Sequence, residues 1–200
     1  MFDFKKCFSG DGKTEFSGLY EIQPKVFSDS RGYFFESYSE RDFFDAGLKM
    51  RFVQDNQSFS TRGVLRGLHF QKAHPQGKLV RALEGRVFDA AVDLRNGSPT
   101  FGKHYGVILD SKKQNQFYIP EGFAHGFLVL SETAVFSYKC TDFYDPKSEG
   151  GILWCDEKIG IDWKSLCQEK EIILSEKDTR HPDFDENKKY FDMTGKWIGE

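Results

Sequence analysis

A series of short apolar segments, with turn signals and little helix between them, dominates the middle of this 200-residue chain. Turn-forming residues cluster at the breaks, as in Asn96-Gly97-Ser98-Pro99 and Pro120-Glu121-Gly122. Such spacing indicates an antiparallel sandwich or barrel, because a parallel sheet needs long crossover connections between its strands. The predicted strands are residues 79–83, 87–94, 105–109, 116–119, 126–130 and 134–140.

Shorter elements are expected before this series. Residues 20–25 and 32–38 are predicted to be strands that a turn joins. Ser39 is a predicted N-cap of a short helix that runs to about Ala46, with Gly47 at its C-terminal end. The sequence therefore predicts an all-β protein with short peripheral helices.

The chain is predicted to form a single domain over residues 1–200, with its core at about 18–180. The segment 181–200 is charged and is expected to wrap around the domain as loop or short helix. Its aromatic anchors are Tyr190, Phe191 and Trp197.

Composition narrows the possible partners and location. Aromatic residues make up 16% of the chain, with 21 Phe and 8 Tyr, which favours β structure. The net charge is −3 and no block of Lys and Arg occurs, so nucleic acid is not an expected partner. No run approaches 18 apolar residues, and no signal-peptide pattern follows Met1, so we expect no membrane contact and a cytoplasmic location.

The segment 63–70, Gly-Val-Leu-Arg-Gly-Leu-His-Phe, carries the strongest chemical signal. Strict strand alternation would place Arg66 and His69 on opposite faces, but the flanking glycines allow the backbone to bend. An arginine beside a histidine suits acid–base chemistry on an anionic substrate. A core histidine satisfied by hydrogen bonds explains the same octapeptide equally well.

Several segments in order along the chain resemble the dTDP-4-dehydrorhamnose 3,5-epimerase family, whose members are jelly-roll proteins of the cupin type. They include Asp-Ser-Arg-Gly-Tyr-Phe-Phe-Glu at 29–36, Pro-Glu-Gly-Phe-Ala-His-Gly-Phe at 120–127 and Leu-Ser-Glu-Lys-Asp at 174–178. The other matching segments are 53–56, 63–70, 76–78, 87–95, 97–102, 138–139 and 159–163. The resemblance implies a cupin-like β-sandwich fold.

The resemblance also implies a reaction, which inverts C3 and C5 of dTDP-4-keto-6-deoxy-D-glucose to give dTDP-4-keto-L-rhamnose. Both carbons lie next to the C4 ketone, so removal of either proton leaves an enolate that is reprotonated from the opposite face. By motif match, His69 resembles the base and Asp178 the carboxylate that orients it. Tyr138 resembles the opposite-face acid, and Lys78 the cation at the enolate oxygen.

Further matches correspond to substrate-binding positions. Those for the diphosphate are Arg31, Arg66 and Lys177, where charge-assisted hydrogen bonds give affinity. Gln54 and Asn56 resemble the pair that reads the nucleobase. Three more residues match other substrate-binding positions, whose individual roles the motifs do not separate: Glu36, His125 and Glu149. The family implies a homodimer that exchanges an N-terminal strand, which would place Arg31 and Glu36 at the neighbouring subunit's site.

Three alternatives stay open beside this interpretation. Many cupins hold a metal through a His-x-His pair, but Gly67 stands where the first histidine would be, so we expect neither metal nor cofactor. A sugar-nucleotide-binding module without activity would not need His69, Tyr138, Lys78 and Asp178 together. An epimerase acting on one carbon, or on another nucleotide-linked 4-keto sugar, is the closest competitor.

One departure from the family pattern bears on Lys78. The segment between His69 and Lys78 is slightly short for the family, which leaves the lysine's position open.

Overall fold

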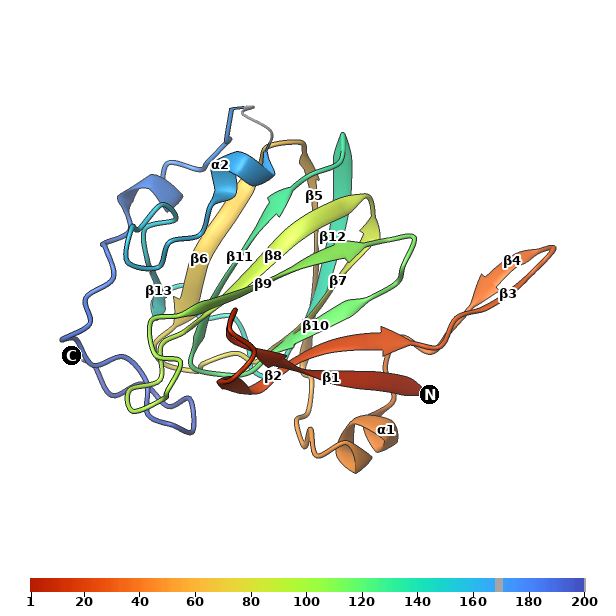
Figure 1. Ribbon diagram of the computed structural model, residues 1–200, viewed down its shortest axis with the longest axis horizontal. Coiled ribbons are helices and arrows are strands. Elements are labelled where there is room, and N and C mark those ends of the chain that lie inside the picture. Colours follow the sequence, from red (N-terminus) through yellow and green to blue (C-terminus); the bar gives the residue numbers. More distant parts are fainter. Residues whose placement is uncertain (168–170, 200) are drawn as a thin grey trace.

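Two antiparallel sheets make up most of the computed structural model, which describes residues 1–167 and 171–199 (Figure 1). The six-stranded sheet has, in spatial order, β1 (Phe2–Phe8), β2 (Glu15–Pro24), β10 (Gln116–Ile119), β7 (Lys78–Glu84), β12 (Thr133–Cys140) and β5 (Gln54–Thr61). The five-stranded sheet has β13 (Glu149–Gly151), β6 (Leu65–Gln71), β11 (Phe123–Val129), β8 (Arg86–Asp93) and β9 (His104–Asp110). Apart from β1–β2 and β8–β9, neighbours within these two sheets are not consecutive in sequence, so the chain crosses repeatedly between the sheets. The predicted jelly-roll fold is confirmed.

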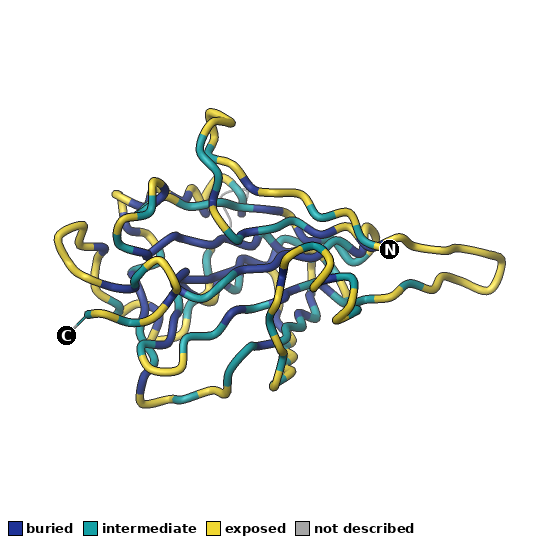
Figure 2. The backbone as a smooth tube through the Cα atoms, turned by 90° about the horizontal axis from the view of Figure 1, so that it is seen from below, coloured by how far each residue is buried: buried dark blue, intermediate teal, exposed yellow. Residues whose placement is uncertain are grey.

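The inner faces of the two sheets pack against each other to form the main core. Alternate residues of β7 and β12, such as Val80 and Phe136, meet residues of β8, β9 and β11, such as Ala91, Leu109 and Phe127. Phe127 and Phe136 stack across the interface with ring centroids 4.2 Å apart. Figure 2 shows the buried backbone running through these layers, with exposed loops at their ends.

The outer faces are covered differently. Helix α1 (Glu40–Asp45) places Phe43 against the six-stranded sheet, and Ser39 caps it by accepting a hydrogen bond from the Asp42 amide. Gly47 follows with φ +87°, a conformation that suits glycine, so the predicted helix is confirmed. The five-stranded sheet is covered by α2 (Trp163–Leu166), the 3₁₀ helix η1 (Asp178–Arg180) and the C-terminal segment, where Tyr190 and Phe191 are buried.

The predicted strand ranges leave out five observed strands, which are β1, β3 (Phe27–Asp29), β5, β6 and β13. Two of them, β1 and β5, carry no apolar run. β1 is an edge strand with exposed lysines, and β5 is a polar edge strand whose inner side chains include Gln54, Asn56 and Ser58. β2 is longer than the predicted strand 20–25 because it begins at Glu15. The predicted strand 32–38 is shorter, since β4 (Gly32–Phe34) ends where its pairing with β3 (Phe27–Asp29) ends.

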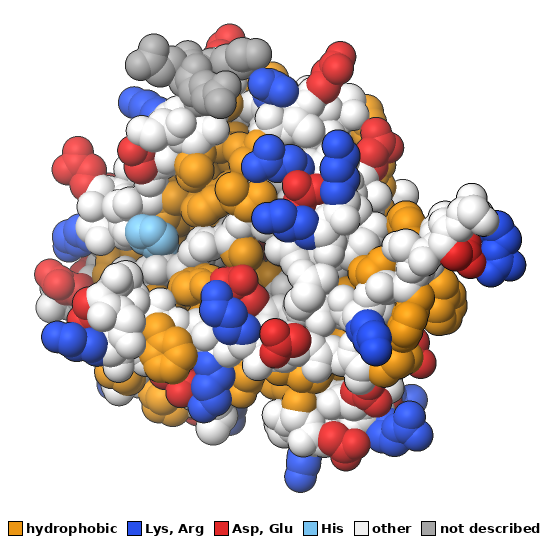
Figure 3. All heavy atoms as spheres, turned by 45° about the vertical axis from the view of Figure 1, so that its right-hand side comes forward, with side chains coloured by type: hydrophobic (Ala, Val, Ile, Leu, Met, Phe, Trp, Pro, Cys, Tyr) orange, Lys and Arg blue, Asp and Glu red, His pale blue; other side chains and the backbone are white. Residues whose placement is uncertain are grey.

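The β3–β4 hairpin projects from the sandwich (Figure 1). Its exposed hydrophobic side chains are visible on the projection in Figure 3, and they include Phe27, Tyr33 and Phe34. Among the described residues, no helix has the length and apolar character to span a bilayer.

Candidate active site

A break in the β6 register brings Arg66 and His69 to the same wall. Their partners on β11 are Phe127 and His125, two residues apart, so β6 carries one extra residue between them. Such a bulge resets the alternation of side chains. Gly67 makes it possible: its φ is +133°, and a Cβ there would lie 2.5 Å from Gly126 Cα.

Both side chains line a cavity of about 470 Å³ that opens between the sheets. The cavity brings together eight of the twelve predicted site residues: Arg66, His69, Lys78, His125, Tyr138, Glu149, Lys177 and Asp178. His69 is one-third exposed into this space, with 32% of its side-chain surface accessible. The interpretation as a site histidine is therefore favoured over that of a core histidine.

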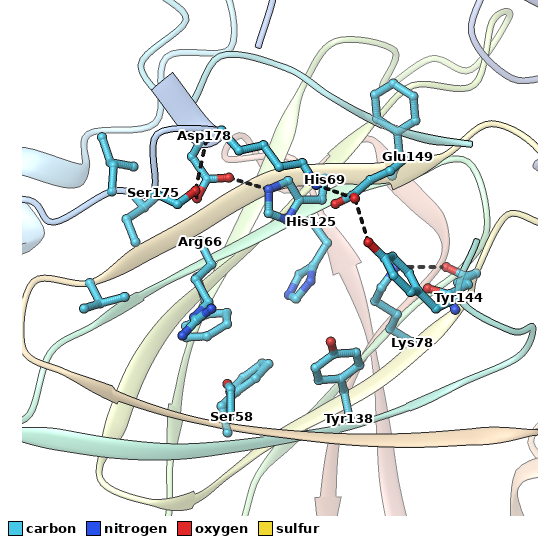
Figure 4. Close-up of a pocket in the computed structure, with 18 of the residues that line it drawn as sticks. Ser58, Arg66, His69, Lys78, His125, Tyr138, Tyr144, Glu149, Ser175 and Asp178 are labelled. Atoms are coloured by element: carbon cyan, nitrogen blue, oxygen red, sulfur yellow. Dashed lines mark hydrogen bonds and ion pairs between the residues drawn. The ribbon is translucent and has the colours of Figure 1, made fainter. Parts of the chain in front are cut away.

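His69 and Asp178 form a close pair. His69 Nε2 lies 2.5 Å from Asp178 Oδ1, and Ser175 Oγ donates to the other carboxylate oxygen at 2.8 Å (Figure 4). Burial alone would raise the pKa of Asp178, but the hydrogen bonds from His69 and Ser175 lower it. The carboxylate is thus ionised and fixed in orientation beside the imidazole.

Tyr138 stands on the opposite wall of the cavity, on the inner face of β12 (Figure 4). The phenol makes no hydrogen bond to another described residue. Burial raises the pKa of Tyr138, which keeps the hydroxyl protonated at neutral pH. This wall therefore offers a proton donor that faces the histidine wall.

Lys78 begins β7 and contributes a cation to the cavity. Its Nζ contacts the Gln76 carbonyl oxygen at 3.4 Å, and it pairs with no carboxylate among the described residues. Burial lowers the pKa of Lys78. The negative charges of nearby Glu121, Asp89 and Glu149 oppose this shift and favour the ammonium form. An ammonium group without a carboxylate partner can stabilise negative charge that develops on a ligand.

His125 forms a second histidine–carboxylate pair deeper in the sandwich. Its Nε2 lies 3.0 and 2.9 Å from the two oxygens of Asp89, whose side chain is fully buried. Burial raises the pKa of Asp89, and the neighbouring His125 only partly opposes this shift. In the β6–β11 ladder His125 lies directly opposite His69.

Charged groups surround the cavity mouth. Arg66 donates to Ser60 Oγ at 3.2 and 3.3 Å, while Lys177 forms an ion pair with Glu149. Tyr144 also donates to Glu149 Oε2, at 2.9 Å. Burial opposes ionisation of Glu149, but the hydrogen bonds from Lys177 and Tyr144 lower its pKa.

The structure places the remaining predicted residues outside the cavity wall. Gln54 and Asn56 bond to each other at 3.1 Å on β5, where Asn56 lies opposite Tyr138 in the ladder. Arg31 is exposed in the hairpin and pairs with Asp29 at 2.6 Å, and Glu36 is exposed after it. Their roles stay predictions.

Sequence reasoning missed His181, which lies beside the His69–Asp178 pair. Its ring packs edge-on against His69 with centroids 5.5 Å apart, and its Nε2 is 3.9 Å from Asp178 Oδ1. Burial and the neighbouring His69 lower the pKa of His181. The signal in the sequence was a histidine three residues after Asp178, a spacing that a helical turn brings to one side.

Comparisons with known proteins point to one family. A family model described as dTDP-4-dehydrorhamnose 3,5-epimerase matches residues 13–186. An enzyme of that name from Methanothermobacter thermautotrophicus is 52% identical over 178 residues, covering 89% of this chain and 96% of the relative. A second relative is the dTDP-6-deoxy-D-glucose-3,5-epimerase of Legionella pneumophila, whose crystal structure is a complex with dTDP-4-keto-L-rhamnose. It is 46% identical in sequence, and the two structures superpose with a TM-score of 0.82 over 92% of this chain and 93% of that one.

A third relative acts on one carbon. The structure of ChmJ, a 3'-monoepimerase from Streptomyces bikiniensis in complex with dTDP-quinovose, is 32% identical with a TM-score of 0.78, covering 86% of this chain and 85% of that one. The fold, the cavity and the matched length agree with the resemblance found in the sequence. This chain belongs to the dTDP-4-dehydrorhamnose 3,5-epimerase family.

Proposed function

We propose that this protein inverts C3 and C5 of dTDP-4-keto-6-deoxy-D-glucose to give dTDP-4-keto-L-rhamnose. The observation that carries the proposal is the placement of His69 and Tyr138 on opposite walls of one cavity. Inversion at a carbon needs proton removal from one face and proton delivery to the other. A base on one sheet and an acid on the facing sheet meet that requirement.

His69 acts as the base in this proposal. Its Nε2 bonds to the ionised Asp178, so the neutral ring carries its proton on Nε2 and its lone pair on Nδ1. Nδ1 therefore accepts the proton from the carbon next to the ketone. Asp178 then stabilises the imidazolium, as the carboxylate does in other His–Asp pairs.

Lys78 and Tyr138 complete each inversion. Proton removal moves negative charge to the C4 oxygen, where the Lys78 ammonium stabilises the enolate. Tyr138 then donates its hydroxyl proton to the opposite face of the same carbon. The Tyr138 phenolate regains a proton and His69 releases one before the next carbon reacts, so the net reaction consumes no proton.

The nucleotide part of the substrate is assigned to the remaining polar groups. Arg66 and Lys177 at the cavity mouth bind the diphosphate. Lys177 breaks its ion pair with Glu149 to do so. Gln54 and Asn56 read the nucleobase. In a homodimer, Arg31 and Glu36 from the neighbouring hairpin region complete the site, which accounts for their exposure in this chain.

Epimerisation at one carbon is the second candidate function, favoured by the similarity to a 3'-monoepimerase. Reaction in deuterated water separates the two, because every reprotonated carbon acquires solvent deuterium. We expect deuterium at both C3 and C5 of the product, observed by NMR. Deuterium at one carbon would establish the single inversion, and deuterium at neither would contradict epimerisation of this substrate.

A further inference from the structure

His181 contains a buried nitrogen whose bonding capacity is unused. Its Nε2 is inaccessible to solvent and has no hydrogen-bond partner among the described residues. Buried polar atoms without a partner are uncommon, because removing them from water costs free energy that nothing repays. The mechanism above assigns no step to His181, so this atom needs another explanation.

Two further ligand atoms lie near this nitrogen. His69 Nε2, Asp178 Oδ1 and His181 Nε2 all lie within 4.8 Å of one another. The nearer pair is His69 with Asp178 at 2.5 Å, and His181 stands 3.9 Å from the same carboxylate oxygen. Two imidazoles and one carboxylate form a common ligand set for Zn²⁺, which adds water at the fourth position.

The surroundings hold these three groups in place. Ser175 Oγ donates to Asp178 Oδ2, which leaves Oδ1 facing both histidines. The His181 ring lies directly over Gly151, where a Cβ would come within 2.5 Å of its Cε1. Such outer contacts are what orients ligands in metal sites.

We propose that His69, Asp178 and His181 bind a Zn²⁺ ion that inhibits the enzyme, and the inhibition rests on the function proposed above. Zinc bonded to His69 Nε2 takes the place of the proton on that nitrogen. The neutral ring must then carry its proton on Nδ1, which loses the lone pair that accepts the substrate proton. No bond in the substrate changes and no electron is transferred.

Calorimetric titration of the substrate-free protein with zinc chloride tests the binding. We expect one Zn²⁺ per chain in the wild type. His181→Gln should bind it at least about 10-fold more weakly, since even lost outer-shell partners cost about 10- to 100-fold. Asp178→Asn should weaken binding as well. The matched control is His74→Gln, which removes an exposed histidine paired with Asp142 and should bind zinc as the wild type does.

Circular dichroism establishes that each variant is folded. Equal affinity in wild type and folded His181→Gln, or no binding to the wild type, would overturn the site. Turnover with added zinc, relative to each variant's own metal-free rate, tests inhibition: wild type and His74→Gln should be inhibited at zinc concentrations that spare His181→Gln. Binding without inhibition would refute the inhibitory role alone. Absence of any metal-free turnover would refute the proposed function, and the titration would still decide the metal site.

Discussion

The two histidine–carboxylate pairs of this protein lie side by side and differ in their surroundings. The His69 side chain is 32% exposed and that of His125 is 10% exposed, although the two residues face each other across one ladder. Asp178 has hydrogen bonds from His69 and Ser175, and its pKa is lowered. Within residues 1–167 and 171–199, Asp89 has a side-chain hydrogen bond from His125 alone, and burial raises its pKa. Burial and the hydrogen-bond donors around each carboxylate, rather than the histidine pair itself, therefore set the direction of its pKa shift.

His69→Ala should have the largest effect on activity, because it removes the accessible member of the first pair and with it the base. Product formation and deuterium exchange at C3 and C5 should fall together by about 10²–10⁴-fold or more. NMR of the reaction in deuterated water measures both quantities. His74→Ala is the control and should retain both. Substantial exchange in His69→Ala would mean that another group removes the proton.

Replacing each carboxylate with its amide tests the comparison directly. Asp178→Asn should lower kcat by about 10- to 150-fold, since a hydrogen bond to a charged group contributes about 1.5–3 kcal/mol. Asp89→Asn should lower kcat less, because Asp89 contacts the histidine that takes no proton from substrate. Steady-state kinetics measures the two values. A larger loss of kcat in Asp89→Asn would reverse the roles of the two pairs.

The two pKa shifts predict opposite effects of pH on stability. Because the pKa of Asp178 is lowered in the folded state, its ionised form stabilises the fold. This contribution is fully present above about pH 3.9, the pKa of an unfolded aspartate, and it is lost as pH falls through the pKa of the folded state. The raised pKa of Asp89 means that stability is lost as pH rises from about 3.9 through its folded value.

Urea unfolding of the wild type and both amide variants at several pH values measures these contributions. The unfolding free energy of the wild type should fall on acidification, and that of Asp178→Asn should fall less. As pH rises from about 3.9, the unfolding free energy should fall less in Asp89→Asn than in the wild type. Parallel pH curves for the two variants would show that the carboxylates do not differ in their native environments.

Chelation should have the smallest effect. Lys78 and hydrogen bonds stabilise the enolate in the proposed mechanism, so EDTA should leave turnover unchanged, or raise it where the preparation carries zinc. Assays before and after dialysis against EDTA measure the change. Activity that is lost with the chelator and restored by a divalent ion would refute a metal-free mechanism.

Much of the fold was predictable because apolar alternation and turn residues mark its strands. β5 was not predicted because its edge position and the cavity both favour polar side chains. Its side chains alternate in burial, but the inward-facing ones are mostly polar, so the sequence shows no apolar alternation. Residue spacing alone would have placed Arg66 and His69 on opposite faces, and the structure resolves this through the bulge at Gly67. Motif resemblance predicted His69, Lys78, Tyr138 and Asp178, which the structure brings to one cavity. It could not reveal His181, whose proximity to His69 depends on how the C-terminal segment packs.

If His69 and Tyr138 act from opposite faces of the substrate, Tyr138→Phe should separate proton removal from inversion. In deuterated water, deuterium uptake and product configuration are followed by NMR in the same sample. We expect exchange to persist, because His69 still forms the enolate, while inverted product falls by about 10²–10⁴-fold. Equal loss of exchange and inversion would show that Tyr138 is not the opposite-face acid and would assign it to binding or to enolate formation.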